Sequence, residues 1–200
     1  MRSYTIVRRP ASGNWNEVPV LPIDNPLKYH DITHIKAQAQ ICYDDEALYV
    51  RMQAVEADIR AEHTGLLDEI CEDSCLEFFF CPMEGDSRYF NLEVNPNCAV
   101  YLGVGSNVHN LLRLIPEEPT VLPTAERAQD GWFIEYTFPH EFVRRIVPDY
   151  APAPGKSMRA NCYKCGDRTV QTHYFAWQPV PDEGSFTFHC PEHFGIMYFG

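Results

Sequence analysis

Residues 75–81 read CLEFFFC and residues 89–95 read YFNLEVN, and these two stretches decide the fold. Apolar side chains occupy every second position in both, as in a β-strand whose successive side chains point to opposite faces. The alternating apolar set is Leu76, Phe78, Phe80, Phe90, Leu92 and Val94. The pattern predicts a hairpin with one face toward a core and the other lined by polar groups.

The same period of two recurs along the chain, and turn-forming residues separate the segments at short intervals. Further strands are expected at residues 35–43, 48–56, 99–104, 131–138, 157–163 and 195–199, with one short helical turn at 141–146. This pattern predicts an all-β protein, an antiparallel β-sandwich of immunoglobulin or jelly-roll type with very little helix. A closed barrel is the alternative. We expect a single domain over residues 1–200, in which residues 1–34 form an irregular N-terminal segment packed on the sandwich.

Composition and charge restrict the partners. Of the 200 residues, 45% are hydrophobic and 22% charged, which is typical of a globular domain. The formal net charge of -12 argues against nucleic acid or an anionic membrane as a partner. The sequence has neither an apolar run long enough for a membrane span nor a secretory signal. We therefore expect a cytoplasmic protein, either a monomer or a weak homodimer that associates through an exposed sheet edge.

The eight cysteines are expected to be free and mostly buried, because a reducing compartment disfavours disulfides. Cys162 and Cys165 form one C-x-x-C pair without the second pair that zinc fingers carry, so metal or redox chemistry is weakly indicated. The sequence has no G-x-S-x-G, P-loop or G-x-G-x-x-G motif. No catalytic residue is predicted, and the protein is not expected to be an enzyme.

The polar face of the predicted hairpin carries Glu77, Asn91, Glu93 and Asn95. Two facing glutamates repel each other, so their presence suggests a nearby arginine, a bound cation or a polyhydroxylated ligand that donates to them. Arg159 and Asn161 lie on the polar face of another predicted strand and are candidates to extend this patch. The alternative is an ordinary solvent-exposed sheet face.

Trp177 lies in the segment HYFAWQP at residues 173–179, where it is expected at a strand end or in a loop. An exposed indole can stack on the apolar face of a sugar ring while carboxylates and amides accept from its hydroxyls. Packing in the core or at its rim is the alternative for this ring. The sugar-binding interpretation depends on the Trp177 indole and the Glu77 carboxylate lying in one open hollow.

Six segments together resemble the carbohydrate-binding module family 9-like proteins. They are residues 43–50 (YDDEALYV), 72–79 (EDSCLEFF), 91–97 (NLEVNPN), 160–167 (ANCYKCGD), 173–179 (HYFAWQP) and 188–195 (FHCPEHFG). The resemblance implies a β-sandwich that binds the ends of plant-polysaccharide chains between two tryptophans, with calcium supporting the fold. It places Glu77, Asn95, Asn161 and Trp177 at the site. The position of the second tryptophan is occupied by Cys71, and a thiol cannot provide the second stacking face.

We therefore expect a noncatalytic protein that binds a saccharide or glycan end through one stacking tryptophan and a polar patch. The predicted ligand-binding residues are Glu77, Asn95, Asn161, Trp177, Arg159 and Tyr174. No cofactor is expected apart from the structural calcium that the resemblance allows. Two alternatives remain: an interaction scaffold that has lost sugar binding, and a metal- or haem-binding domain. A filled, flat surface around Trp177 would favour the scaffold.

Overall fold

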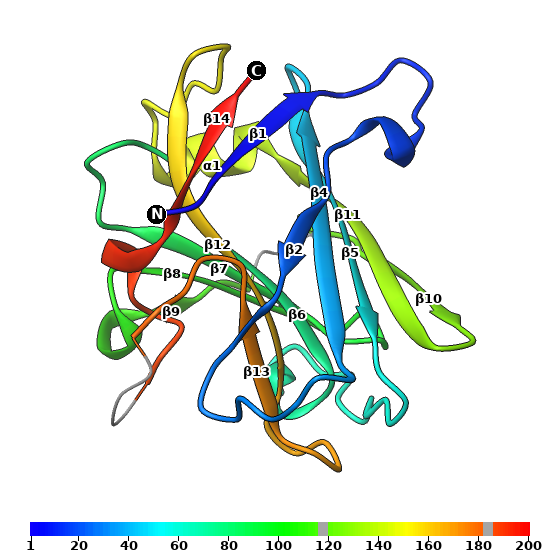
Figure 1. The fold of residues 1–200 in the computed structure, drawn as a ribbon. Coiled ribbons are helices and arrows are strands. Elements are labelled where there is room, and N and C mark those ends of the chain that lie inside the picture. The colour runs from blue at the N-terminus through cyan, green and yellow to red at the C-terminus, as the bar shows by residue number, and fades with distance from the viewer. Residues whose placement is uncertain (116–119, 182–185) are drawn as a thin grey trace.

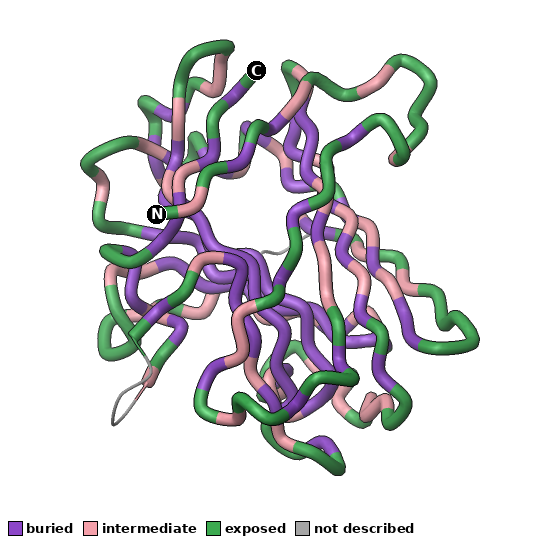
Figure 2. Tube along the Cα trace, in the orientation of Figure 1, coloured by how far each residue is buried: buried purple, intermediate pink, exposed green. Residues whose placement is uncertain are grey.

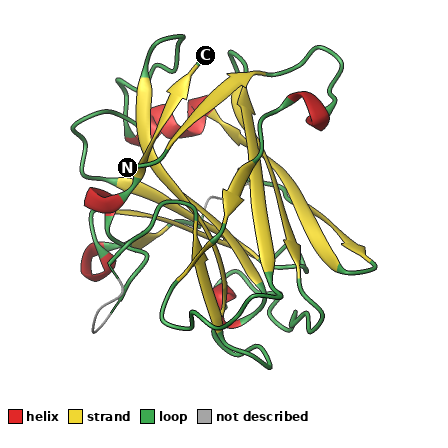
Figure 3. Cartoon of the chain, in the orientation of Figure 1, coloured by secondary structure: helices red, strands yellow, loops and turns green. Residues whose placement is uncertain are grey.

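The computed structural model describes residues 1–115, 120–181 and 186–200 (Figure 1). The strands are β1 (Ser3–Arg8), β2 (Leu21–Ile23), β3 (Asn25–Pro26), β4 (Lys36–Tyr43), β5 (Ala47–Val55), β6 (Cys75–Cys81), β7 (Tyr89–Val94), β8 (Val100–Gly105), β9 (Leu112–Arg113), β10 (Thr124–Ala128), β11 (Gly131–Pro139), β12 (Ser157–Gly166), β13 (His173–Ala176) and β14 (Gly195–Phe199). Helices are short: α1 (His140–Ile146) and the 3-10 turns η1 (Trp15–Glu17), η2 (Ile70–Glu72), η3 (Val108–Asn110) and η4 (Pro191–His193). Figure 3 shows how strands dominate the chain, and the predicted all-β class is confirmed. In the part of the chain described, no helix is long and apolar enough to cross a membrane.

The strands form two layers that share β1. One layer has the order β10-β11-β5-β4, with β2 also paired to β4. The other, which we call the large sheet, has the order β14-β12-β6-β7-β8-β9, with β13 beside β12 and β3 beside β13. β1 pairs with β14 through Ser3–Ile6 and with β4 through Val7–Arg8, in parallel both times. The sandwich is therefore mixed rather than purely antiparallel, and β1 passes from one layer to the other (Figure 1).

The N-terminal segment is more regular than the sequence suggests. The expectation of an irregular segment over residues 1–34 is wrong, because β1, β2 and β3 lie within it. Tyr4 and Ile6 of β1 are buried in the core. Their alternation spans too few residues to predict a strand, and the backbone hydrogen bonds that stabilise β1 come from strands distant in the sequence.

The main core lies between the two layers. The six alternating residues of β6 and β7 all belong to it, as do Met158, Ala160 and Cys162 of β12. Figure 2 shows that buried chain runs through the middle of both layers. The predicted inward faces of these three strands are therefore confirmed. Burial of this aromatic and aliphatic surface is the main term that stabilises the fold.

A buried polar network interrupts this core. Lys164 is fully buried. Its Nζ lies 3.2 Å from Glu56 Oε1 and 2.7 Å from His173 Nε2. Glu56 Oε1 also accepts a 2.6 Å hydrogen bond from Trp132 Nε1, and Glu56 Oε2 accepts from Ser74 Oγ. Burial, followed by repulsion from Lys164, lowers the pKa of His173 to about 4. The lysine therefore neutralises a carboxylate that burial would otherwise leave unpaired.

A second, smaller core covers the outer face of the large sheet. Phe79 and Tyr89, which point outward from β6 and β7, pack with Phe188 and Phe194 of the C-terminal loop. Ile70 of η2 is buried in the same layer. The outward face of the β6–β7 hairpin is thus not an ordinary solvent-exposed sheet face, and its polar groups are enclosed by loops.

Candidate functional site

The outer face of the large sheet carries a pair of glutamates on neighbouring strands. Glu77 of β6 and Glu93 of β7 are direct partners in the antiparallel register. Tyr163 of β12 lies beside Glu77, and Tyr101 of β8 lies beside Glu93, so the four residues form one row across the sheet. The predicted sharing of one face by the two glutamates is confirmed, and we call Glu77 and Glu93 the acid pair.

Both members of the acid pair are buried, at 2% and 6% exposure. The Cys165 thiol donates to Glu77 Oε1 at 2.8 Å, and Asn91 Nδ2 donates to Glu93 Oε1 at 3.1 Å. Burial raises the pKa of Glu77 well above its usual value, and the charge of Glu93 raises it further. Burial likewise raises the pKa of Glu93 to about 7. The acid pair therefore sits where additional hydrogen-bond donors would stabilise its ionised form.

Asn91 supplies an unused acceptor next to the acid pair. This side chain is fully buried, and its Oδ1 has no hydrogen-bond partner among the described residues. A buried amide oxygen without a donor is costly and uncommon in native proteins. Because this oxygen is enclosed as well as unpartnered, a ligand hydroxyl can donate to it only if the groups that cover it move aside.

Half-buried side chains surround the acid pair. The Arg113 guanidinium lies 4.2 Å from the centre of the Tyr101 ring and donates to the Asp68 carbonyl at 2.8 Å. Its positive charge lowers the pKa of Glu93, against the larger effect of burial. Cys71 lies close enough to both glutamates for their charges to raise its thiol pKa, after burial. These groups form the rim of the candidate site.

Tyr174 provides an aromatic surface on the β13 side of the candidate site. It lies on β13 opposite Cys165 of β12, and its hydroxyl hydrogen-bonds Asp167. The Tyr174 ring stacks on Tyr29 with a centroid distance of 5.9 Å and an interplanar angle of 18°. Phe186 meets it edge-on at 4.8 Å. Of the aromatic residues predicted for the site, Tyr174 is the one whose ring is half-buried rather than enclosed in the core.

Trp177 does not lie at the surface. Its side chain is 3% exposed and belongs to the core between the two layers, on the opposite face of the large sheet from the acid pair. A Cβ built on Gly195 would come within 2.6 Å of the ring, so the indole fills the space beside this glycine. The expectation that Trp177 and Glu77 share one hollow is wrong. Residues 173–177 continue the strand alternation, and that parity turns Phe175 and Trp177 inward and Tyr174 outward.

The two predicted asparagines use their amides within the protein. Asn95 closes the turn after β7: its Nδ2 donates to Asp73 Oδ2, and its Oδ1 accepts from the Asn97 and Ala99 amides. Asn161 Nδ2 donates to the Tyr163 hydroxyl, and Asn161 Oδ1 accepts from the backbone amide of residue 178. Both side chains are fully buried. The structure gives them a structural role, and their contact with a ligand stays a prediction.

Arg159 anchors the C-terminal loop instead of pointing at the acid pair. Its guanidinium donates to the Glu192 carbonyl and, at 3.5 Å, to the Phe194 carbonyl. In the sheet register Arg159 is opposite Cys81, four residues along β6 from Glu77. The structure therefore brings together Glu77, Glu93, Asn91 and Tyr174, and separates them from Arg159 and Trp177.

Tyr101 and Arg113 were not predicted for the site. Tyr101 could have been found, because the strand parity that places Glu93 outward also places its neighbour in β8 outward. Arg113 lies on β9, a strand of two residues, which is too short to give a periodic signal. Its place opposite Gly103 depends on tertiary structure.

All eight cysteines are free, and six are buried, as expected. Cys162 and Cys165 do not act together: Cys162 lies in the main core, whereas Cys165 lies in the outer layer. Their separation by three positions in a strand turns them to opposite faces. Cys162 and Cys165 therefore do not converge on one metal ion or form one disulfide.

Among the described residues, the one close cluster of acidic, cysteine or histidine ligand atoms is poorly suited to calcium. Calcium takes six to eight oxygen ligands. Among residues 1–115, 120–181 and 186–200, the one cluster of three His, Cys, Asp or Glu ligand atoms within 4.8 Å of one another is Cys75, Glu77 and Cys165. Two of these three atoms are sulfur, which calcium does not favour. Structural calcium stays a prediction of the resemblance alone.

The curled β-sandwich with a polar patch on one sheet has the architecture of a carbohydrate-binding module, and the comparison with sequence families agrees. The profile of Carbohydrate-binding family 9 matches residues 14–199. The chain therefore belongs to carbohydrate-binding family 9, as its sequence motifs predicted. Family membership supports a carbohydrate-binding function. No curated protein matches the sequence.

Three solved structures share the fold. A protein of Bacteroides uniformis, provisionally described as carbohydrate-binding, is 23% identical, with a TM-score of 0.78 over 100% of this chain and 99% of the other. A family 9 module of Caldicellulosiruptor kristjanssonii in complex with cellotriose is 14% identical, with a TM-score of 0.65 over 99% and 93%. The same organism's family 9 module in complex with glucose is 13% identical, with a TM-score of 0.66 over 100% and 96%.

Proposed function

We propose that this protein binds a saccharide over the acid pair, on the outer face of the large sheet. The observation that carries the proposal is the buried Glu77–Glu93 pair beside the unpartnered Oδ1 of Asn91. These groups accept hydrogen bonds, and sugar hydroxyls donate them. A ligand seated there would satisfy acceptors that the described protein leaves short of donors.

Aromatic stacking in this site comes from tyrosine. Tyr101 of β8 lies next to Glu93 at one end of the row, and Tyr174 of β13 lies opposite Cys165, two positions along β12 from the Tyr163 that neighbours Glu77. Tyr174 is already held by Tyr29 and by its hydrogen bond to Asp167. A ring held in this way loses little conformational freedom on binding a sugar face. We assign Tyr174 the stacking role that the sequence analysis gave to Trp177.

The proposed activity is binding without catalysis. Glycoside hydrolysis uses two carboxyl groups that flank the scissile bond. Glu77 and Glu93 are neighbours in one sheet and present their carboxyl groups to the same side of a bound sugar. This arrangement suits recognition of adjacent hydroxyls better than proton transfer across a glycosidic bond.

Isothermal titration calorimetry with glucose and cellotriose tests the proposal, because fold neighbours were solved with these sugars. We expect saturable binding by the wild-type protein and a loss of at least about tenfold in affinity for Glu77→Gln and for Tyr174→Ala. Glu135→Gln is the matched control, since Glu135 lies on β11 in the other layer, at a cavity that also contains Trp15 and Tyr49.

Two outcomes would contradict the proposal. If Glu135→Gln lowers the sugar affinity and Glu77→Gln does not, the site lies on the β11 side of the sandwich. The absence of binding to these sugars and to a glycan array, in a protein shown to be folded, would favour the interaction scaffold.

A further inference from the structure

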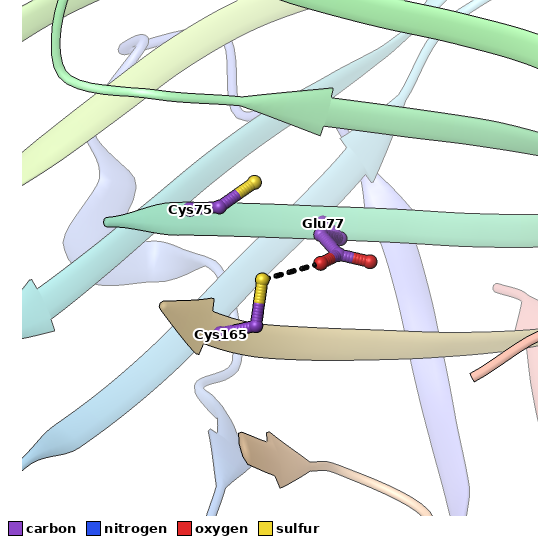
Figure 4. Close-up of side chains that lie close together, drawn as sticks. All are labelled: Cys75, Glu77 and Cys165. Carbon is purple, nitrogen blue, oxygen red and sulfur yellow. Dashed lines mark hydrogen bonds between the residues drawn. The ribbon is translucent and has the colours of Figure 1, made fainter. Parts of the chain in front are cut away.

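Two thiols and one carboxylate converge at the base of the candidate site. Cys75 of β6 and Cys165 of β12 are direct partners in the antiparallel register, and Glu77 follows Cys75 by two positions on the same face. Figure 4 shows the three side chains together, with the Cys165 thiol directed at the Glu77 carboxylate. Their ligand atoms all lie within 4.8 Å of one another.

These distances are close to those of a metal centre. Zinc–sulfur and zinc–oxygen bonds of about 2.0–2.3 Å in a tetrahedron place neighbouring ligand atoms roughly 3.4–3.8 Å apart. Small side-chain rotations would bring Cys75 Sγ, Cys165 Sγ and Glu77 Oε1 into this range. All three residues lie on paired strands rather than loops, so the backbone holds them in place.

The donor set selects the kind of metal. Two sulfur donors and one carboxylate suit a soft or borderline ion such as zinc or cadmium, and not calcium or magnesium. All three residues are at most 2% exposed, so a bound ion would be shielded from water. The Cys165 thiol also lies 3.7 Å from the Cys71 carbonyl oxygen, to which it donates.

The local charge balance also favours a cation. Glu93 lies beside Glu77, and Asp167 lies close enough to add to the negative potential on both glutamates. Lys164 partly offsets this charge, but its side chain lies on the opposite face of the large sheet, paired with Glu56. A divalent ion that replaces the two thiol protons leaves the net charge of the cluster unchanged, and the neighbouring carboxylates attract the ion.

We propose that Cys75, Cys165 and Glu77 form a binding site for a thiophilic divalent metal ion of the zinc type. This site goes beyond the proposed sugar binding, although both use Glu77. Metal and sugar would then compete for, or share, the same carboxylate. A test with metal alone keeps the two proposals separate.

Reduced protein, stripped with a chelator and kept in a phosphine reductant, is titrated with Cd²⁺ while ultraviolet thiolate-to-cadmium charge-transfer absorption is recorded. Zn²⁺ affinity is then measured by competition with a chromophoric chelator. We expect saturation at about one equivalent. Cys75→Ser and Cys165→Ser should each lower the affinity by at least about tenfold, whereas Glu77→Gln should weaken binding and retain the sulfur absorption.

Cys190→Ser is the matched control, because Cys190 is also a buried free thiol in the outer layer but lies outside the cluster. It should bind Cd²⁺ as the wild type does. If Cys165→Ser does not fold, Cys165→Ala replaces it. Thermal unfolding with and without Zn²⁺ provides a second readout: metal should raise the Tm of the wild type and of Cys190→Ser, but not of the Cys75 and Cys165 variants. No stoichiometric binding by folded wild-type protein, or binding unchanged in Cys75→Ser and Cys165→Ser, would overturn the proposal.

Discussion

Glu77 and Glu93 face each other across β6 and β7, and both carboxyl groups are buried on the outer face of the large sheet. Two like charges in this position destabilise the fold when both are ionised. The pair therefore lowers the stability of the protein without a ligand. A bound ligand that donates hydrogen bonds to both carboxylates would account for its presence.

The first prediction concerns the pH dependence of stability. The folded-state pKa of Glu93 is raised by burial from 4.5 to about 7, so the folded protein binds its proton more tightly than the unfolded chain does. This contribution is fully present below about pH 4.5 and is lost as the pH rises through 7. Between pH 5 and 8, the free energy of unfolding of the wild type should fall by roughly 2–3 kcal/mol relative to Glu93→Gln.

Urea denaturation of both proteins across this pH range measures the difference directly. Burial lowers the pKa of His173 and of His189 to about 4. Because the unfolded chain then binds these protons more tightly, their contribution to stability is lost as the pH falls from 6.5 to 4. That opposite trend is common to both proteins and cancels in the comparison. Parallel stability curves for wild type and Glu93→Gln would show that the Glu93 proton is held no more tightly in the folded state.

The second prediction concerns the buried Lys164–Glu56 pair. Lys164→Met leaves the Glu56 carboxylate buried without its cation, so the free energy of unfolding should fall by about 3–5 kcal/mol. The double variant Glu56→Gln/Lys164→Met should be more stable than Lys164→Met, because it removes the unpaired charge. Lys156→Met, at an exposed position, serves as the control and should change stability little. A Lys164→Met protein within about 1 kcal/mol of wild type would contradict this account.

The third prediction separates structural from ligand-binding aromatic residues. Trp177→Ala should lower the free energy of unfolding by about 3–5 kcal/mol, because it leaves a large cavity in the main core. Under conditions where the variant is folded, its sugar affinity should match that of the wild type. Trp15→Ala, which removes a half-buried side chain of η1, should cost less stability and serves as the control. If Trp177→Ala loses sugar affinity while its stability is unchanged, the Trp177 ring contacts the sugar and the prediction is wrong.

Strand parity explains which parts of the site were predictable. The alternation in residues 75–81 and 89–95 correctly predicts the inward Phe78 and Leu92 and the outward Glu77 and Glu93. The same rule, applied to residues 173–177, turns Trp177 inward, whereas the turn-forming residues after it favour a strand end or loop. Tyr174, one of the predicted residues, lies on the outward side as parity requires.

Other features depend on tertiary contacts that no local pattern contains. The loop that packs Phe188 and Phe194 over Phe79 is irregular, so the sequence alone does not show that the polar face is covered. The Cys75–Cys165 partnership joins residues ninety positions apart, and it is visible only in the register of β6 with β12. Each of these features bears on the chemistry of the candidate site, which is why sequence analysis places Glu77 correctly but not its surroundings.

The most direct test of the central claim is a crystal structure of the protein with glucose or cellotriose. We predict sugar density over the acid pair, with hydroxyls within hydrogen-bond distance of Glu77, Glu93 and Asn91 Oδ1 and a sugar face against Tyr174. Density confined to the β11 side of the sandwich, beside Trp15 and Tyr49, would contradict the assignment of the site.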